Sequence, residues 1–147
     1  MRNVNKIIIH CSATRDRQSL SPKDLTKMHK QRGFNGCGYH YYVRRDGEIC
    51  TMRPVDRVGA HCKGHNADSI GICYEGGLDV NGNPADTRTD RQRFSLRALV
   101  RVLKKDFKIK TVVGHRDLSP DLNGDGVIEP HEWIKQCPCF DVSKEEW

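Results

Sequence analysis

The sequence predicts an α/β fold in which a single domain has a central mixed β-sheet flanked by helices. Three short apolar runs have the length and composition of buried strands, and they span residues 6–11, 69–74 and 110–115. Two longer segments, 21–32 and 89–108, carry the signals of helices and alternate with these strands. Because strands and helices are interleaved, we expect one mixed sheet covered by helices. The length of 147 residues predicts one domain, spanning 1–147.

Both predicted helices have a clear starting residue. Ser21 is a good N-cap and Pro22 suits the first helical position, so this helix should run to a stop at Gly33. Thr89 and Gln92 have the spacing of a capping box. The second helix should pack on the sheet through an apolar stripe at helical spacing. The residues of the stripe are Leu96, Leu99, Val100, Leu103 and Phe107.

The remaining elements are shorter. Residues 39–45 read as a strand with Tyr39 on one face, and Asp46-Gly47 is a strong signal for a hairpin back through residues 48–53. A third, short helix is expected over residues 130–136. We expect His29 to lie on the solvated face of the first helix.

Composition limits the partners that we expect. The formal net charge of +6 favours a polyanionic partner, although it also fits simple solubility. The basic residues are scattered and are not interleaved with aromatic residues, so no specific nucleic acid is predicted. No apolar stretch approaches the roughly 18 residues of a membrane span, so no membrane partner is predicted either. The protein is expected to be a monomer.

The N-terminus and the cysteines predict the compartment of synthesis. The first residues, MRNVNKIIIH, lack the apolar core of a secretory signal, so synthesis in the cytoplasm is expected. There are seven cysteines, so they cannot all pair within one chain. A reducing compartment would keep them as thiols. We therefore expect no obligatory disulfide framework, and most of these cysteines should be small buried apolar residues.

Two histidines and a cysteine form a candidate metal site. His10 and His115 each end a short apolar strand. If those strands are parallel neighbours, both imidazoles emerge at the carboxyl edge of the sheet, where open α/β sheets bind ligands. Together with Cys137 they would supply three protein ligands and leave a fourth position open, as in catalytic zinc sites. The alternatives are ordinary, partly buried histidines, or a set in which His61 and His65 are ligands instead.

A second candidate metal site is the segment 121–132, which has the pattern of a calcium-binding loop. Oxygen ligands stand at positions one, three, five and twelve, and a backbone carbonyl is expected at position seven. The five residues are Asp121, Asn123, Asp125, Val127 and Glu132. Ser119-Pro120 precedes them where an entering helix belongs, so we expect half of an EF-hand, with only the exiting helix. The alternative is a plain turn with solvated carboxylates.

Several motifs, in order along the chain, resemble those of one enzyme family. They are IIIHCSAT (7–14), GYHYYVRRDG (38–47), GAHCKGHNADSIGICYEGG (59–77), VVGHRD (112–117) and KQCPCFD (135–141). In these motifs and over nearly its whole length the chain resembles the small zinc-dependent N-acetylmuramoyl-L-alanine amidases. This family includes phage lysozymes and is related to animal peptidoglycan-recognition domains. The insert at 121–132 departs from the shortest phage members, and nothing about catalysis carries over to it.

The resemblance implies a role for each residue of the candidate site. His10, His115 and Cys137 would be the zinc ligands, and Tyr39 and Lys135 the catalytic side chains. The groove near the metal would be lined by two further residues, His61 and Asn66. Taken without the resemblance, Tyr39 would be an aromatic residue packed on the sheet and Lys135 a surface lysine.

The resemblance also implies an activity and a place of action. The activity is hydrolysis of the amide bond between N-acetylmuramic acid and the L-alanine of the peptidoglycan stem peptide. We expect an endolysin of phage or prophage type that reaches the cell wall after release. The alternatives are a non-catalytic muropeptide-binding module and a regulator that binds a polymerase. The presence of both Cys137 and Lys135 favours the enzyme.

Overall fold

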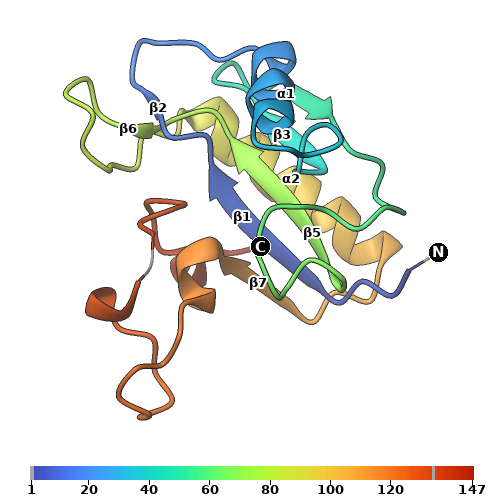
Figure 1. Cartoon of the computed structure of the whole chain (residues 1–147), viewed down its shortest axis with the longest axis vertical. Helices are drawn as coiled ribbons and strands as arrows, with labels where there is room; N and C mark the ends of the chain where they lie inside the picture. The colour runs from blue at the N-terminus through green and yellow to red at the C-terminus, as the bar shows by residue number, and fades with distance from the viewer. Residues whose placement is uncertain (1, 134) are drawn as a thin grey trace.

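A five-stranded mixed sheet forms the centre of the computed structural model, which describes residues 2–133 and 135–147 (Figure 1). The strand order is β4-β3-β5-β1-β7. The strands are β1 (Lys6–Cys11), β3 (Tyr41–Val43), β4 (Ile49–Thr51), β5 (Ser69–Tyr74) and β7 (Thr111–Gly114). β1 pairs in parallel with both β5 and β7, β3 pairs in parallel with β5, and β4 joins antiparallel at the edge. The predicted mixed central sheet is confirmed.

The two long helices cover opposite faces of this sheet. α1 (Pro22–Gln31) lies in front of it in Figure 1 and α2 (Asp90–Asp106) lies behind. Side chains alternate between the two faces along each strand, so the core has two parts. Leu96 and Val100 of α2 belong to one cluster with Ile7 and other strand residues. Leu25 of α1 belongs to a second cluster, which also contains Tyr42 and Cys73.

Local hydrogen bonds explain where both helices begin. The Ser21 hydroxyl accepts a hydrogen bond from the Asp24 amide at 3.1 Å. The Thr89 hydroxyl accepts from the Gln92 amide at 3.1 Å, and the Gln92 side chain accepts in return from the Thr89 amide at 2.9 Å. Both predicted caps are confirmed, because each satisfies amides that have no partner within the first turn.

Two predicted elements differ from the structure. The strand expected over 39–45 is limited to Tyr41–Val43, so Tyr39 lies before the strand. The helix expected over 130–136 was wrong, because only a 3-10 turn, η2 (Pro130–Glu132), forms there. The chain becomes extended at Trp133, whose ψ is 122°, and Ile134 lies outside the described residues.

The elements that complete the fold are short. β2 (Thr14–Arg15) and β6 (Gly77–Leu78) form a small parallel sheet. The 3-10 turns η1 (His115–Leu118) and η3 (Val142–Lys144) precede and follow a segment, around residues 120–133, that extends away from the main sheet (Figure 1). Of the helices in the described chain, none has the length and apolar character needed to cross a bilayer.

The cysteines occur as thiols in this fold. All seven are free, and Cys11, Cys37, Cys62 and Cys73 are buried. Those four are small core residues, as the sequence predicts.

We predict that Gln92→Ala destabilises the protein by about 1–3 kcal/mol, the usual cost of leaving buried polar groups unpaired. Gln92 is fully buried, and its amide group donates to the carbonyl of Glu75 at 2.8 Å as well as completing the cap. The measurement is the free energy of unfolding in urea. Arg101→Ala, on the exposed side of the same helix, should change it by less than about 0.5 kcal/mol. Equal effects of the two variants would contradict this account of Gln92.

Candidate metal centre and active site

The register of the parallel strands brings the two predicted histidines together. β1 and β7 are neighbours, and Ile9 pairs with Gly114. His10 directly follows Ile9, and His115 directly follows Gly114, so both histidines reach the carboxyl edge of the sheet. His115 is the first residue of η1, directly after the strand. The predicted arrangement of the two strands is confirmed.

Cys137 is brought to the same edge by hydrogen bonds from three different segments. The Arg116 amide donates to the Cys137 carbonyl at 2.9 Å, and the Cys11 amide donates to the Cys137 sulfur at 3.2 Å. The hydroxyl of Tyr74 donates to the carbonyl of Pro138 at 2.6 Å. These bonds hold the C-terminal segment against β1 and η1.

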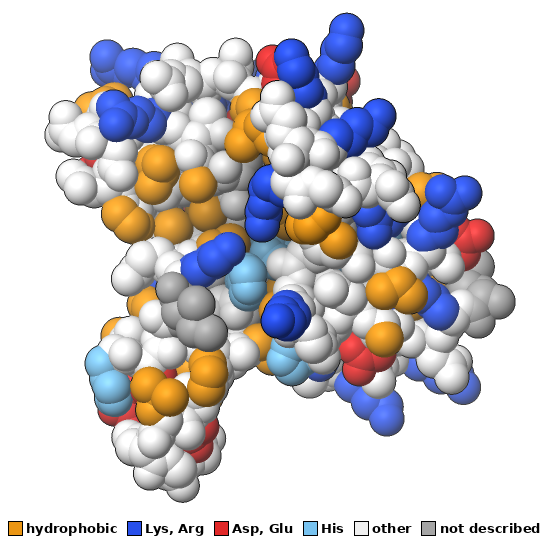
Figure 2. Space-filling view, in the orientation of Figure 1, with side chains coloured by type: hydrophobic (Ala, Val, Ile, Leu, Met, Phe, Trp, Pro, Cys, Tyr) orange, Lys and Arg blue, Asp and Glu red, His pale blue; other side chains and the backbone are white. Residues whose placement is uncertain are grey.

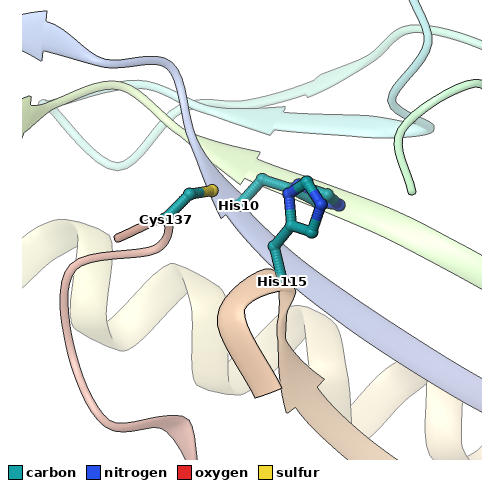
Figure 3. A group of neighbouring side chains, drawn as sticks. All are labelled: His10, His115 and Cys137. Atoms are coloured by element: carbon teal, nitrogen blue, oxygen red, sulfur yellow. The ribbon is translucent and has the colours of Figure 1, made fainter. Parts of the chain in front are cut away.

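The three side chains converge on one point (Figure 3). One ligand atom from each of His10, His115 and Cys137 lies within 4.8 Å of the other two. The rings of His10 and His115 are 4.7 Å apart between centroids. Two imidazole nitrogens and one sulfur at this separation are a donor set that could hold a metal ion.

A chain of hydrogen bonds leads away from His10 into the protein. His10 Nε2 lies 2.9 Å from His61 Nδ1, and His61 Nε2 lies 3.3 Å from the Ser69 hydroxyl. That hydroxyl donates to the carbonyl of His65 at 2.7 Å, so its oxygen is left to accept from His61 Nε2. Neutral His61 then accepts at Nδ1 the proton that His10 carries on Nε2. This direction leaves His10 Nδ1 free to bind a metal.

Burial keeps the imidazoles of His10 and His61 neutral. Desolvation, followed by the electrostatic influence of the neighbouring His61 imidazole, holds the pKa of His10 well below its ordinary value. The same desolvation lowers the pKa of His61 to about 3. A metal-binding histidine must be deprotonated at the ligating nitrogen, and both rings meet this requirement at neutral pH.

His61 and His65, the alternative ligands considered from the sequence, have other contacts in the structure. The described residues form a metal-sized group of ligand atoms around His10, His115 and Cys137 without either of them. His61 contacts His10 as a hydrogen-bond acceptor, and His65 contributes its carbonyl to the chain.

A large cleft opens over this group of ligands. Its volume is about 960 Å³, and its lining includes Tyr39, His61, Asn66 and Lys135 beside two of the candidate ligands, His115 and Cys137. Figure 2 shows the hollow, with histidine side chains at its base, between the main body and the projecting C-terminal segment. Its lining further includes Leu25, Met28, Arg32, Phe34 and Lys63.

Tyr39 lies beside His10, one of the candidate metal ligands. Its ring is 4.9 Å from that of His10 and 5.2 Å from that of His29. Desolvation raises the pKa of Tyr39 well above its ordinary value, so the phenol keeps its proton and is a hydrogen-bond donor at neutral pH.

His29 is a site residue that the sequence analysis placed wrongly. It is buried, with 5% exposure, and its Nδ1 accepts a hydrogen bond from the Gly38 amide at 2.7 Å. His29 stands four residues after Leu25, on the buried side of α1, and that spacing was the available signal.

Asn66 and Lys135 approach the cleft in different ways. The Asn66 side-chain oxygen accepts from the amides of His61 and Cys62 at 3.0 and 2.9 Å, so it fixes the loop that carries His61. Lys135 is exposed, and it lies close enough to His10 for its charge to contribute to the lowered pKa of that histidine.

The calcium-like loop brings its carboxylates together. Asp121, Asp125 and Glu132 have oxygens within 4.8 Å of one another. Asp121 accepts from the amides of Gly124 and Gly126 at 3.1 and 2.7 Å, which closes the loop around its first residue. The exiting helix expected after the loop was wrong, since the 3-10 turn η2 stands in its place.

Glu132 closes the other end of this loop. It is buried, and its carboxylate accepts from the backbone amides of Glu129, Leu122 and Asn123. These amides, with that of Glu129 contributing most, lower the pKa of Glu132. Asn123 accepts from the Asp125 amide at 3.2 Å, and the Val127 side chain is 58% exposed.

The fold and the metal-binding geometry together match one class of hydrolase. The chain belongs to the N-acetylmuramoyl-L-alanine amidase family, whose sequence model matches residues 1–138. The resemblance noted in the sequence motifs is confirmed.

Individual relatives agree with this assignment. The endolysin of Klebsiella phage KP32 is 34% identical over 143 residues, which are 97% of this chain and 85% of the endolysin. An uncharacterized protein of Haemophilus influenzae is 52% identical over 97 residues, covering 66% of this chain and 84% of that protein. Among solved structures, the endolysin amidase LysCS from Clostridium intestinale URNW has a TM-score of 0.75 at 31% identity, covering 95% of this chain and 78% of LysCS. Bumblebee PGRP-SA, at 20% identity and a TM-score of 0.72, shares the fold over 94% of this chain and 77% of its own.

We predict that Ser69→Ala weakens zinc binding by about tenfold, the lower end of the range for groups that orient metal-binding histidines. The substitution removes the acceptor of His61 Nε2 and with it the preference for the His10 tautomer that leaves Nδ1 free. The measurement is competition for zinc with a chromophoric chelator. Ser95→Ala, at a hydroxyl bonded to the Gly47 carbonyl on the opposite side of the sheet, is the matched control. An unchanged affinity in folded Ser69→Ala would contradict the orienting role.

Proposed function

We propose that this amidase cleaves the bond between N-acetylmuramic acid and L-alanine with a zinc ion held by His10, His115 and Cys137. The observation that carries the proposal is the convergence of these three ligand atoms at the base of a cleft. Imidazole and thiolate ligands suit zinc, and three protein ligands leave a position for water or substrate. The cleft is large enough for a small ligand such as a muropeptide.

Zinc bound in such a site lowers the pKa of water from 15.7 to about 7 and polarises a carbonyl group. The surrounding residues would hold and orient the ligands. His61 keeps the His10 proton on Nε2, and the hydrogen bond from the Cys11 amide fixes the Cys137 sulfur. His10 is buried, at 1% exposure, whereas His115 is partly exposed and lines the cleft.

Lys135 and Tyr39 are proposed as the catalytic side chains. The tetrahedral intermediate of amide hydrolysis carries an oxyanion, which a nearby cation or hydrogen-bond donor stabilises. Lys135 lies two residues before Cys137 and lines the cleft. Tyr39, a protonated phenol beside His10, is placed to donate a hydrogen bond at the same reacting centre.

The cell wall is the proposed place of action. Endolysins are among the relatives that match 97% of this chain, and their amidase fold is shared. We infer that this chain is an endolysin that is made in the cytoplasm and reaches peptidoglycan after release.

We predict that Lys135→Ala lowers kcat by about 100- to 1,000-fold, the usual effect of removing one oxyanion donor. Zinc affinity should be unchanged, because Lys135 is not a ligand. Cys137→Ser should lose both zinc and activity. The measurement is release of L-alanine-terminated stem peptides from purified peptidoglycan, with zinc content determined on the same samples.

Lys108→Ala, at an exposed lysine beyond the end of α2, is the control and should keep full activity. Full activity of a protein freed of metal by a chelator would contradict the zinc mechanism. Wild-type rates in Lys135→Ala would contradict the proposed role of Lys135 but not the zinc mechanism.

We also propose that calcium binds the 121–132 loop and orders the segment that follows it. The carboxylates of Asp121, Asp125 and Glu132 share a space of less than 5 Å, and a hydrogen bond to Asp125 raises the pKa of Glu129. A divalent cation would offset the repulsion among carboxylates held this close, and oxygen ligands at these positions suit calcium. The loop ends at Glu132, three residues before Lys135, so ordering it would position the proposed oxyanion donor.

We predict that calcium raises the melting temperature of the wild-type protein but not that of Asp121→Asn/Asp125→Asn, because the variant lacks two ligands. The measurement is thermal unfolding with calcium or with a calcium-selective chelator. Asp56→Asn/Asp106→Asn changes the charge equally at exposed positions outside the loop and should respond as the wild type does. Equal responses of all three proteins would rule out this calcium site.

A further inference from the structure

The outward side of α2 carries a line of positive charges that the amidase site does not use. Arg91, Arg101 and Lys105 are exposed on this helix, and exposed Lys108 follows just beyond its end. The spacings of ten and four residues place Arg91, Arg101 and Lys105 on one side of a helix with 3.6 residues per turn, and Lys108 follows after the helix ends at Asp106. The buried residues Leu96, Leu99 and Leu103 lie on the other side.

Exposed apolar side chains lie within this line of charges. Phe94 is 77% exposed and Val102 is 54% exposed. Phe94, Ala98 and Val102 are four residues apart, so they form an apolar strip along the helix beside Arg101 and Lys105. Two large apolar side chains, Phe94 and Val102, are therefore exposed together on a helix whose other large apolar residues, Leu96, Leu99, Val100 and Leu103, are buried.

These cations are also free to act on a partner. Among the described residues, Arg91, Arg101, Lys105 and Lys108 take part in none of the ion pairs of 4.0 Å or less. Other α2 cations are engaged, since Arg93 pairs with Asp86 and Arg97 with Glu145. The acidic residues of α2, Asp90 and Asp106, are confined to its two ends.

We propose that this side of α2, defined by Arg91, Phe94, Arg101, Val102, Lys105 and Lys108, docks on the surface of an anionic lipid bilayer. Clustered cations on a helix are attracted to anionic head groups, and an exposed aromatic ring enters the boundary between head groups and acyl chains. The absence of a long apolar stretch predicts no membrane-spanning segment, and docking on the surface of a bilayer requires none.

The apolar strip distinguishes a bilayer from a soluble polyanion. A polyanion would be held by the cations alone, and stacking on nucleic acid requires several aromatic rings along a groove. Here a single convex helix side combines charges with Phe94 and Val102. That combination fits a flat surface with charged head groups above an apolar layer.

The position of the docking side leaves the catalytic cleft open. α2 lies behind the sheet in Figure 1 and covers the face to which Ile7 and Ile9 contribute. Because side chains alternate along β1, His10 points to the other face of the sheet. An enzyme held through α2 would thus present its cleft away from the bilayer.

The test is sedimentation of the full-length protein with vesicles of phosphatidylcholine containing 30% phosphatidylglycerol, and with vesicles of phosphatidylcholine alone. We expect binding to the anionic vesicles only, weakened at 0.5 M salt because charge attraction is screened. Arg101→Glu/Lys105→Glu and, separately, Phe94→Ser should each lower the binding at least tenfold. Unchanged melting temperatures of the variants show that the fold is intact.

Lys23→Glu/Lys27→Glu, at exposed positions of α1, changes the net charge equally and is the matched control. This control should retain binding. Absence of binding to the anionic vesicles would overturn the proposal, as would an equal loss in the control pair. Undiminished binding by Phe94→Ser, together with equally tight binding to soluble polyphosphate, would show a polyanion site and also overturn it. None of these outcomes depends on zinc or on amidase activity.

Discussion

The parallel pairing of β1 with β7 is the constraint on which the proposed active site depends. Ile9 pairs with Gly114, so the residue after each of them, His10 and His115, reaches the same edge of the sheet. β5, on the other side of β1, contributes Ser69 to the hydrogen bonds that fix His10, and Tyr74 to those that fix the segment after Cys137. A shift of register by one residue would turn His10 to the opposite face of the sheet. The site is thus a consequence of strand register, and its distant ligands need no local motif.

The surroundings of these strands also determine the protonation state and the tautomer of the imidazoles. Burial disfavours protonation, and the chain from His10 through His61 to Ser69 selects one tautomer. The two groups proposed to act on substrate have different surroundings. Tyr39 is packed between His10 and His29, whereas Lys135 is exposed in the segment next to the calcium-like loop. The buried residues of the site are held by hydrogen bonds and packing, and the proposed effect of calcium concerns the exposed segment.

Much of the fold could be predicted from local patterns. The limits of β1 and β5 and the caps at Ser21 and Thr89 follow from apolar runs and capping residues, and the structure confirms them. The helix expected after Pro130 fails because the carboxylate of Glu132 binds amides of the preceding loop and the chain is extended at Trp133. The prediction that His29 is solvated is wrong, because His29 lies one helical turn after the buried Leu25 and shares its side of α1. The hydrogen bonds among His61, Ser69 and His65 depend on tertiary packing, and no spacing in the sequence indicates them.

The central claim is that His10, His115 and Cys137 bind one zinc ion together. X-ray absorption at the zinc edge of the loaded, full-length protein tests it most directly. The claim predicts two nitrogen ligands at about 2.0–2.1 Å, one sulfur at about 2.3 Å and one further light atom. A spectrum without a sulfur ligand, or with two or more, would contradict it.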